Sequence, residues 1–119
     1  MFLVRVEADF AAAHFLKHYH GKCERVHGHN YKVRAWARGP SLGPGGMLFD
    51  FGELKAALRA VLESLDHSLL NDQTVFEDDP SAERIAEFVF KGIVSRLPAV
   101  PLHAVEVFET DTSMARYEP

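Results

Sequence analysis

This sequence contains a single cysteine, no long apolar run and fewer basic than acidic residues. The single cysteine, Cys23, rules out an intramolecular disulfide, and a lone thiol without a secretory signal indicates a reducing compartment, with the cytoplasm as the expected location. The longest apolar run near the N-terminus, Phe10 to Ala13, is far too short for a signal-peptide core or a membrane span. A net charge of −4 argues against generic nucleic-acid binding, which needs a basic surface. We therefore expect a protein that neither enters membranes nor binds nucleic acid.

The composition is that of an ordinary globular protein. Apolar residues make up 47% and charged residues 25%, which is enough apolar material to bury a core without disulfides. The length of 119 residues, with no stretch of linker composition, predicts a single domain over residues 1–119. Charge is uneven, because residues 14–34 contain several basic side chains and only one acidic one, Glu24. This segment either presents a positive field to a small anion or forms an ordinary solvated face.

Two segments alternate between apolar and polar residues as half-buried strands do. Over residues 3–14 the charged side chains fall on odd positions, and apolar side chains fill the even ones. Residues 27–38 alternate in the same way after a polar loop at 16–26. Residues 102–110 and 113–118 alternate less sharply, and we predict that they form two closing strands.

Two amphipathic helices are predicted between these pairs of strands. Asp50, with Glu53 three residues later, matches a capping box, and apolar residues then recur at three- and four-residue spacing over 54–65. A second helix is predicted over residues 81–97, between two prolines. The order β-β-α-α-β-β predicts an α+β fold, with an antiparallel four-stranded sheet and two helices on one face.

Three histidines share the apolar face of the first two predicted strands. His14 is in phase with the apolar residues before it, and His27 and His29 begin the apolar face of the next strand. Residues at i and i+2 lie about 6.6 Å apart along a strand, so both imidazoles can reach one ion at about 2.0–2.1 Å. A lone histidine in such a position is more often a hydrogen-bonded core residue. Three in phase favour a catalytic Zn²⁺ site with an open fourth position.

Cys23 lies four residues before His27, in the loop that leads to this cluster. Three roles are open for Cys23: a fourth zinc ligand, an inert small residue or a catalytic base. A nearby metal ion and cationic side chains lower the pKa of a thiol, so a thiolate here can remove a proton from a bound substrate. The spacing does not separate these roles.

The candidate catalytic and substrate-binding residues also include Asp66, His67 and Glu109, which lie at the predicted ends of a helix and a strand. Asp66 and His67 are predicted to end the first helix, where an imidazolium is favoured but a carboxylate opposes the helix dipole. Asp66 therefore suits orienting or charging His67. Glu109 ends an apolar strand face, where a partly buried carboxylate needs a partner. Three partners are open for the Glu109 carboxylate: an arginine, water, or a ligand with two adjacent N–H groups.

Six segments together resemble the 6-pyruvoyl-tetrahydropterin synthase family, a tunnelling-fold group that includes the 6-carboxy-5,6,7,8-tetrahydropterin synthases of queuosine biosynthesis. Each segment is a weak signal alone, but all six follow the family's order across nearly the whole chain. The segments are F-A-A-A-H at 10–14, C-E-R-V-H-G-H-N-Y at 23–31, F-D-F-G-E-L-K at 49–55, L-D-H-S-L-L-N-D at 65–72, P-S-A-E-R-I-A at 80–86 and V-F-E-T at 107–110.

The resemblance implies a role for each candidate residue. It implies that Cys23 is the catalytic base, that Asp66 and His67 complete its relay, that Glu109 anchors a pterin ring, and that the zinc ligands are His14, His27 and His29. The implied substrate is 7,8-dihydroneopterin triphosphate, and its triphosphate suits the basic segment 17–34. The implied assembly is a homo-oligomer, a hexamer built as a dimer of trimers, with active sites shared between subunits.

Two products are possible within the family. Three residues separate Cys23 from His27, which resembles the branch that makes 6-carboxy-5,6,7,8-tetrahydropterin with release of acetaldehyde and triphosphate. The 6-pyruvoyl branch, which eliminates triphosphate, usually has a longer insertion there. An alternative of another class is a non-catalytic zinc-binding protein in which Cys23 closes a Cys-His₃ site. That alternative leaves Asp66, His67 and Glu109 without a role.

Overall fold

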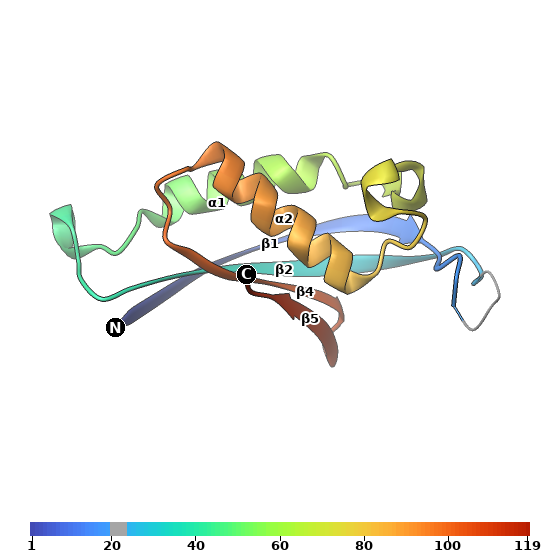
Figure 1. Ribbon diagram of the computed structural model, residues 1–119, viewed down its shortest axis with the longest axis horizontal. Coiled ribbons are helices and arrows are strands. Elements are labelled where there is room, and N and C mark those ends of the chain that lie inside the picture. Colours follow the sequence, from blue (N-terminus) through green and yellow to red (C-terminus); the bar gives the residue numbers. More distant parts are fainter. Residues whose placement is uncertain (20–23) are drawn as a thin grey trace.

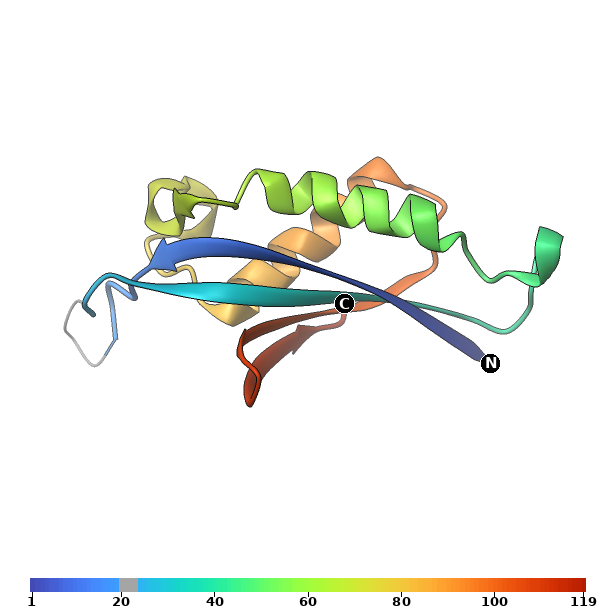
Figure 2. The same ribbon diagram turned by 180° about the vertical axis from the view of Figure 1, so that it is seen from behind.

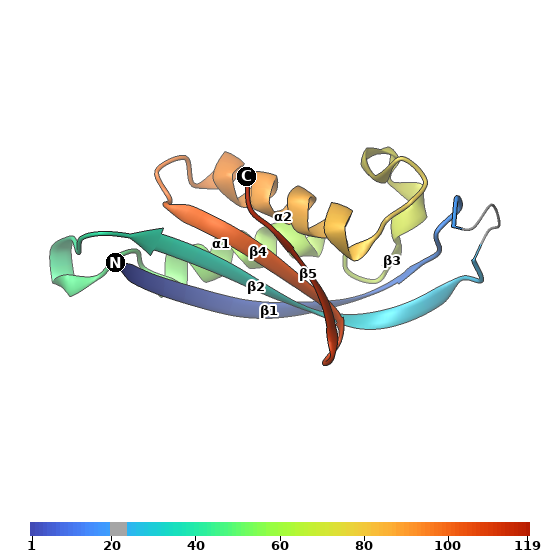
Figure 3. The ribbon, with the colours of Figure 1, turned by 60° about the horizontal axis from the view of Figure 1, so that its bottom comes forward.

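A twisted sheet with two helices on one face makes up the computed structural model, which describes residues 1–19 and 24–119 (Figures 1 and 2). The helices are α1 (Phe51–Glu63) and α2 (Ala82–Arg96). The long strands are β1 (Phe2–His14), β2 (His27–Gly39), β4 (Leu102–Thr110) and β5 (Ser113–Tyr117). This architecture confirms the predicted α+β fold. Figure 3 shows the sheet from the face that the helices leave open.

The strands β1 and β2 form one long antiparallel hairpin. Their register runs without a shift from Phe2 opposite Gly39 to His14 opposite His27. Even-numbered residues of β1 and odd-numbered residues of β2 turn toward the helices, so Phe10 stacks on Tyr31 with ring centroids 4.7 Å apart. The alternation of apolar and polar residues therefore decides which side chains face the helices at the end of the hairpin where His14 lies opposite His27.

The sheet has five strands, so the prediction of four was wrong in this respect. The order is β3-β1-β2-β4-β5, and the added strand β3 (Ser68–Leu69) pairs in parallel with β1 at Ala12 and Ala13. A strand of two residues is too short to show alternation in sequence. Three short 3-10 turns, Pro44–Gly46, Leu70–Asp72 and Thr74–Phe76, lie in the segments between the longer elements.

Both helices begin with a side-chain cap, and the sequence predicts the one at Asp50. The Asp50 side chain accepts hydrogen bonds from the backbone N–H groups of Gly52 and Glu53, and the Ser81 hydroxyl accepts one from Arg84. The buried apolar residues of α1 are Leu54, Ala57, Leu58, Val61 and Leu62. No helix in the described part of the chain is long and apolar enough to cross a membrane.

The first helix ends earlier than predicted, which changes the interpretation of Asp66. It stops at Glu63 with Ser64 as its C-cap, so Asp66 and His67 lie in the turn beyond it. The helix dipole acts mainly on the last turn of a helix, so the predicted opposition between the dipole and the Asp66 carboxylate does not apply at this position. The contacts of Asp66 with β1, described below, explain it instead.

The two helices approach each other closely at Gly92, and we expect Gly92→Ala to destabilise the protein. A Cβ atom there would lie 2.8 Å from Val61 Cγ2 and 3.0 Å from Val61 Cγ1. Alanine is favoured over glycine in a helix by about 1 kcal/mol, but overpacking costs about 1–3 kcal/mol, and the β-branched Val61 cannot rotate away easily. The free energy of unfolding, measured in urea, should fall by about 1–2 kcal/mol. In a Val61→Ala background, Gly92→Ala should stabilise the protein. Destabilisation in both backgrounds would contradict the packing argument.

Candidate metal and substrate site

Three imidazoles meet at the end of the hairpin, on the face that the helices cover. His14 lies opposite His27, and His29 lies opposite Ala12, the residue two positions before His14. One ligand atom from each of the three rings lies within 4.8 Å of the others. His14 is buried, whereas His27 and His29 are partly exposed. The unshifted register of the hairpin thus brings residues from two strands into one cluster.

Backbone carbonyls fix the orientation of two of these rings. His14 Nδ1 donates to the Pro80 carbonyl oxygen and His27 Nδ1 to the Arg25 carbonyl oxygen, both at 2.8 Å. A carbonyl oxygen can only accept, so Nδ1 carries the hydrogen and, in the neutral ring, Nε2 keeps its lone pair. This arrangement, with one nitrogen anchored to a backbone oxygen and the other free, is typical of histidines that bind metal ions.

Two of the imidazole nitrogens are buried without a partner. His14 Nε2 and His29 Nε2 have no hydrogen-bond partner among the described residues. Leaving a buried polar atom unpaired costs about 1–3 kcal/mol. Burial also lowers the pKa of His29, a shift that the Glu109 carboxylate opposes, so the ring favours the neutral form that binds metals. Neutral imidazoles with free Nε2 atoms are ligands that suit Zn²⁺, and the cluster therefore fits a metal site.

Glu109 faces the same space from the end of β4. Its carboxylate oxygens lie 3.8 Å from His14 Nε2 and 3.9 Å from His29 Nε2, which is too long for hydrogen bonds. It also lines a depression of about 200 Å³ with Ala82 of α2 and residues 113–115 of β5. Among the described residues its ion-pair partners are these imidazoles and no arginine. The carboxylate thus keeps capacity to accept hydrogen bonds.

Glu106 shows the contrasting case of a partnered carboxylate on the same strand. It lies on the open face of the sheet, where Trp36 Nε1 donates to it at 2.6 Å and Arg116 lies 3.0 Å away. Its side chain is buried and satisfied by these two neighbours. Glu106 therefore does not need a ligand, whereas Glu109 has room for one.

Asp66 and His67 form a pair at the outer edge of β1. Asp66 Oδ2 lies 3.0 Å from His67 Nδ1, and Asp66 Oδ1 accepts a hydrogen bond from the Ala11 N–H at 2.9 Å. That N–H, and to a lesser degree the His67 ring, hold the pKa of the Asp66 carboxyl below its usual range. The carboxylate is therefore charged at neutral pH and orients the imidazole.

The backbone of His67 is held in an uncommon conformation. Its φ of 55° lies in the left-handed region, and its N–H donates to the Ala11 carbonyl at 2.6 Å. The side chain is 83% exposed, so the ring points toward solvent rather than into the cluster of three imidazoles. His67 and His29 nevertheless both line an open depression of about 530 Å³, together with neighbouring residues of β1, β2 and β3. Strained residues of this kind are frequent at functional sites.

The remaining predictions concern Cys23 and the basic segment. Cys23 lies outside the described residues. Lys32 and Arg34 are on the open face of the sheet, opposite to the imidazoles, and they pair with Asp111 and Glu7 respectively. These two cations are therefore not beside the cluster within one chain.

Sequence reasoning missed Tyr31, which packs against the histidine cluster. Its ring contacts His14 and His29 edge-on, at centroid distances of 5.8 and 5.3 Å. The hydroxyl is buried without a partner among the described residues, and burial raises its pKa, so it stays protonated. A signal was available, because Tyr31 continues the i, i+2 phase of His27 and His29. The Pro80 carbonyl was also missed, since a backbone acceptor leaves no mark in sequence.

Comparison with known proteins identifies relatives along almost the full chain. A relative from Synechocystis named 6-carboxy-5,6,7,8-tetrahydropterin synthase is 42% identical over 98% of this chain and 93% of its own. A human relative named 6-pyruvoyl tetrahydrobiopterin synthase is 34% identical over 82% of this chain and 71% of its own.

The fold is shared with solved structures. The structure of Caenorhabditis elegans 6-pyruvoyl tetrahydropterin synthase superposes with a TM-score of 0.82 at 29% identity, covering 100% of this chain and 97% of that one. The profile of the family described as 6-pyruvoyl tetrahydropterin synthase matches residues 3–119. With its three-histidine cluster on the same fold, the chain belongs to the 6-pyruvoyl tetrahydropterin synthase family.

Proposed function

We propose that the protein is a zinc-dependent lyase that converts 7,8-dihydroneopterin triphosphate and water to 6-carboxy-5,6,7,8-tetrahydropterin, with release of acetaldehyde and triphosphate, in queuosine biosynthesis. The observation that carries this proposal is the cluster of three imidazoles, two of which have buried and unpartnered Nε2 atoms. The 42% identity to the Synechocystis 6-carboxy-5,6,7,8-tetrahydropterin synthase supports this product over the 6-pyruvoyl product.

In the proposed mechanism, His14, His27 and His29 would hold the Zn²⁺ ion. When bound, the ion supplies Lewis-acid polarisation of the side-chain hydroxyls of the substrate, which acidifies the neighbouring C–H bonds. Cys23, as a thiolate, removes a proton from the substrate. His67 exchanges protons with the thiol, and Asp66 keeps the imidazole oriented through the 3.0 Å contact with Nδ1.

We propose that the protein works as a homo-oligomer in the cytoplasm, as a hexamer of two trimers with sites shared between subunits. The exposed ring of His67 supports sharing, because another chain can enclose a proton-transfer group that faces solvent in one chain. The strand β5 is at one edge of the sheet, and its free side is available for pairing with another copy. Analytical ultracentrifugation tests the assembly directly.

Incubation with 7,8-dihydroneopterin triphosphate, followed by identification of every product, tests the proposed reaction. Acetaldehyde together with 6-carboxy-5,6,7,8-tetrahydropterin is the expected result. Triphosphate release without acetaldehyde would identify the 6-pyruvoyl reaction instead. This reaction is the second candidate because the human relative is named 6-pyruvoyl tetrahydrobiopterin synthase. A metal-loaded protein that consumes no substrate would leave the non-catalytic Cys-His₃ site as the better interpretation.

We expect Glu109→Gln to weaken substrate binding while leaving the fold and the zinc content intact. The carboxylate is proposed to accept from two adjacent N–H groups on the amino-pyrimidine edge of the pterin, and glutamine replaces one acceptor with a donor. Hydrogen bonds to charged groups contribute about 1.5–3 kcal/mol, so KM should rise at least about tenfold.

Glu106→Gln is the matched control for this variant, because Glu106 is on the same strand but on the open face. It should leave KM unchanged. Normal substrate binding by Glu109→Gln would show that the pterin ring is held elsewhere.

A further inference from the structure

The hydroxyl of Tyr31 is buried beside the histidine cluster. The side chain is 0% exposed, and its oxygen has no hydrogen-bond partner among residues 1–19 and 24–119. The ring stacks on Phe10, and a second phenylalanine would fill the place of Tyr31 equally well. Because the large majority of buried side-chain polar atoms in native proteins are hydrogen-bonded, the extra oxygen indicates an acceptor that comes within its reach at this site.

Three candidate acceptors lie near this hydroxyl. The Tyr31 ring contacts the rings of His14 and His29 edge-on. In the register of β2 and β4, Glu109 follows the last paired residue of β4 and comes beside Tyr31. Burial raises the pKa of the Tyr31 hydroxyl, and the charge of Glu109 raises it further, so the hydroxyl keeps its hydrogen and is a donor. The candidate acceptors are therefore the Nε2 atoms of the two imidazoles and the Glu109 carboxylate.

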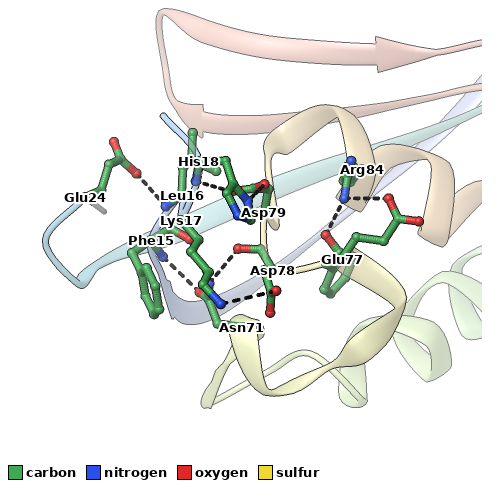
Figure 4. Close-up of polar contacts among 11 residues, drawn as sticks. Phe15, Leu16, Lys17, His18, Glu24, Asn71, Glu77, Asp78, Asp79 and Arg84 are labelled. Carbon is green, nitrogen blue, oxygen red and sulfur yellow. Dashed lines mark hydrogen bonds and ion pairs between the residues drawn. The ribbon is translucent and has the colours of Figure 1, made fainter. Parts of the chain in front are cut away.

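The His14 ring is held too firmly to turn toward the hydroxyl. Its Nδ1 donates to the Pro80 carbonyl at 2.8 Å, and Pro80 ends the segment 71–80. This segment is itself tied to the chain that leaves β1, because Asn71 accepts from the Phe15 N–H at 2.9 Å and donates to the Phe15 carbonyl at 2.8 Å (Figure 4). The side of the ring that carries Nε2 is thus fixed, and Nε2 stays directed toward the other members of the cluster.

The Glu109 carboxylate lies almost close enough to become a metal ligand itself. Its oxygens are 3.8 Å from His14 Nε2 and 3.9 Å from His29 Nε2. Ligands bound at about 2.0–2.2 Å around a tetrahedral Zn²⁺ ion are about 3.3–3.5 Å apart, and carboxylates are common zinc ligands. A shift of about 0.5 Å would therefore bring the carboxylate within reach of the proposed ion. Without a restraint, Glu109 would close the fourth position and lose its capacity to hold a pterin ring.

We propose that Tyr31 is a positioning residue whose hydroxyl donates a hydrogen bond to the Glu109 carboxylate in the metal-bound protein and holds this carboxylate off the ion. The inference rests on the proposed function, in so far as it takes the three histidines as metal ligands and Glu109 as the group that binds the pterin. Once the ion takes the Nε2 lone pairs, the carboxylate is the acceptor that remains of the three. It has about four lone-pair sites, so one bond from Tyr31 leaves room for two N–H groups of the ring. Tyr31 itself touches no reacting atom.

Loading with Co²⁺ tests the proposal without substrate, because the visible absorption bands of this ion report its ligands. In Tyr31→Phe the released carboxylate should bind the ion, so the cobalt spectrum should differ from that of the wild type. The dissociation constant for Zn²⁺ should fall by at least about tenfold, within the range by which groups around a site change its metal affinity. KM should rise by at least about tenfold, as for Glu109→Gln. Without metal, the free energy of unfolding in urea should not fall, because the substitution breaks no hydrogen bond among the described residues.

Adding Glu109→Gln to Tyr31→Phe should restore the wild-type cobalt spectrum, a reversal that a merely structural role of Tyr31 would not produce. Tyr117→Phe is the matched control, because it removes the same group from a tyrosine of β5 that packs against Phe90. It should leave the spectrum, the zinc affinity and KM unchanged. A Tyr31→Phe protein with the wild-type spectrum and zinc affinity would overturn the proposal. A wild-type protein that binds cobalt but turns over no substrate would refute only the proposed reaction, and one that binds no cobalt would overturn both.

Discussion

A His14→Ala variant should lose most of its zinc and, with it, all measurable turnover. His14 is 2% exposed and is one of three imidazoles that we propose as ligands, so its loss leaves two imidazoles to hold the ion. Loss of an outer-shell partner already costs about 10–100-fold in metal affinity, and loss of a ligand should cost more. Metal analysis of the purified protein after dialysis measures the effect.

His103→Ala is the control for this experiment. His103 is on β4 and lies 3.6 Å from Glu118, at the end of the strand remote from Glu109. It should keep one zinc per chain. Cys23→Ala should also keep the metal, because the three histidines are sufficient in the proposed site; zinc loss in this variant would make Cys23 a fourth ligand and remove it as a base.

Loss of Cys23 and loss of His67 should each lower kcat severely, and the double variant should be little worse than either single one. Groups that act as one proton-transfer unit fail together, so their effects on kcat are not additive. We expect each single variant to reduce kcat by about 10²–10⁴-fold, the usual contribution of general acid–base catalysis. Steady-state rates of Cys23→Ala, a His67 variant and the double variant complete the cycle.

The backbone at position 67 decides which substitution to use. With φ at 55°, alanine would be strained and could shift the turn that holds Asp66, whereas asparagine adopts this conformation readily. His67→Asn is therefore the better variant, and an unchanged melting temperature would show that the turn is intact. Defects in kcat that multiply in the double variant would show that Cys23 and His67 act independently.

The sequence predicts the histidine cluster well because alternation along a strand is a strict geometric rule. His14, His27 and His29 are in phase with apolar residues, and the hairpin keeps its register to the end, so all three face the helices. The predicted start of the first helix is equally local, since Asp50 bonds to residues within three positions. Local rules of this kind do not depend on the rest of the fold.

What the sequence does not predict depends on contacts between distant segments. The two-residue strand β3 exists because the turn at His67 bonds to Ala11, and neither residue shows this in its neighbourhood. Asn71 belongs to a segment that marks the family, yet its three hydrogen bonds to Phe15 and Asp78 come only with the structure. The mistaken helix end near Asp66 has the same cause, because the carboxylate is satisfied by a strand 55 residues earlier in the chain.

The unshifted pairing of the hairpin separates two kinds of change in length. One residue inserted into β1 between Phe10 and His14 would turn His14 to the opposite face of the sheet and remove it from the cluster. Residues added between Leu16 and Glu24, whose mutual bonds close the loop, would leave the phase of both strands unchanged. During divergence, the number of residues in this loop is therefore free to increase or decrease while the three imidazoles stay in place.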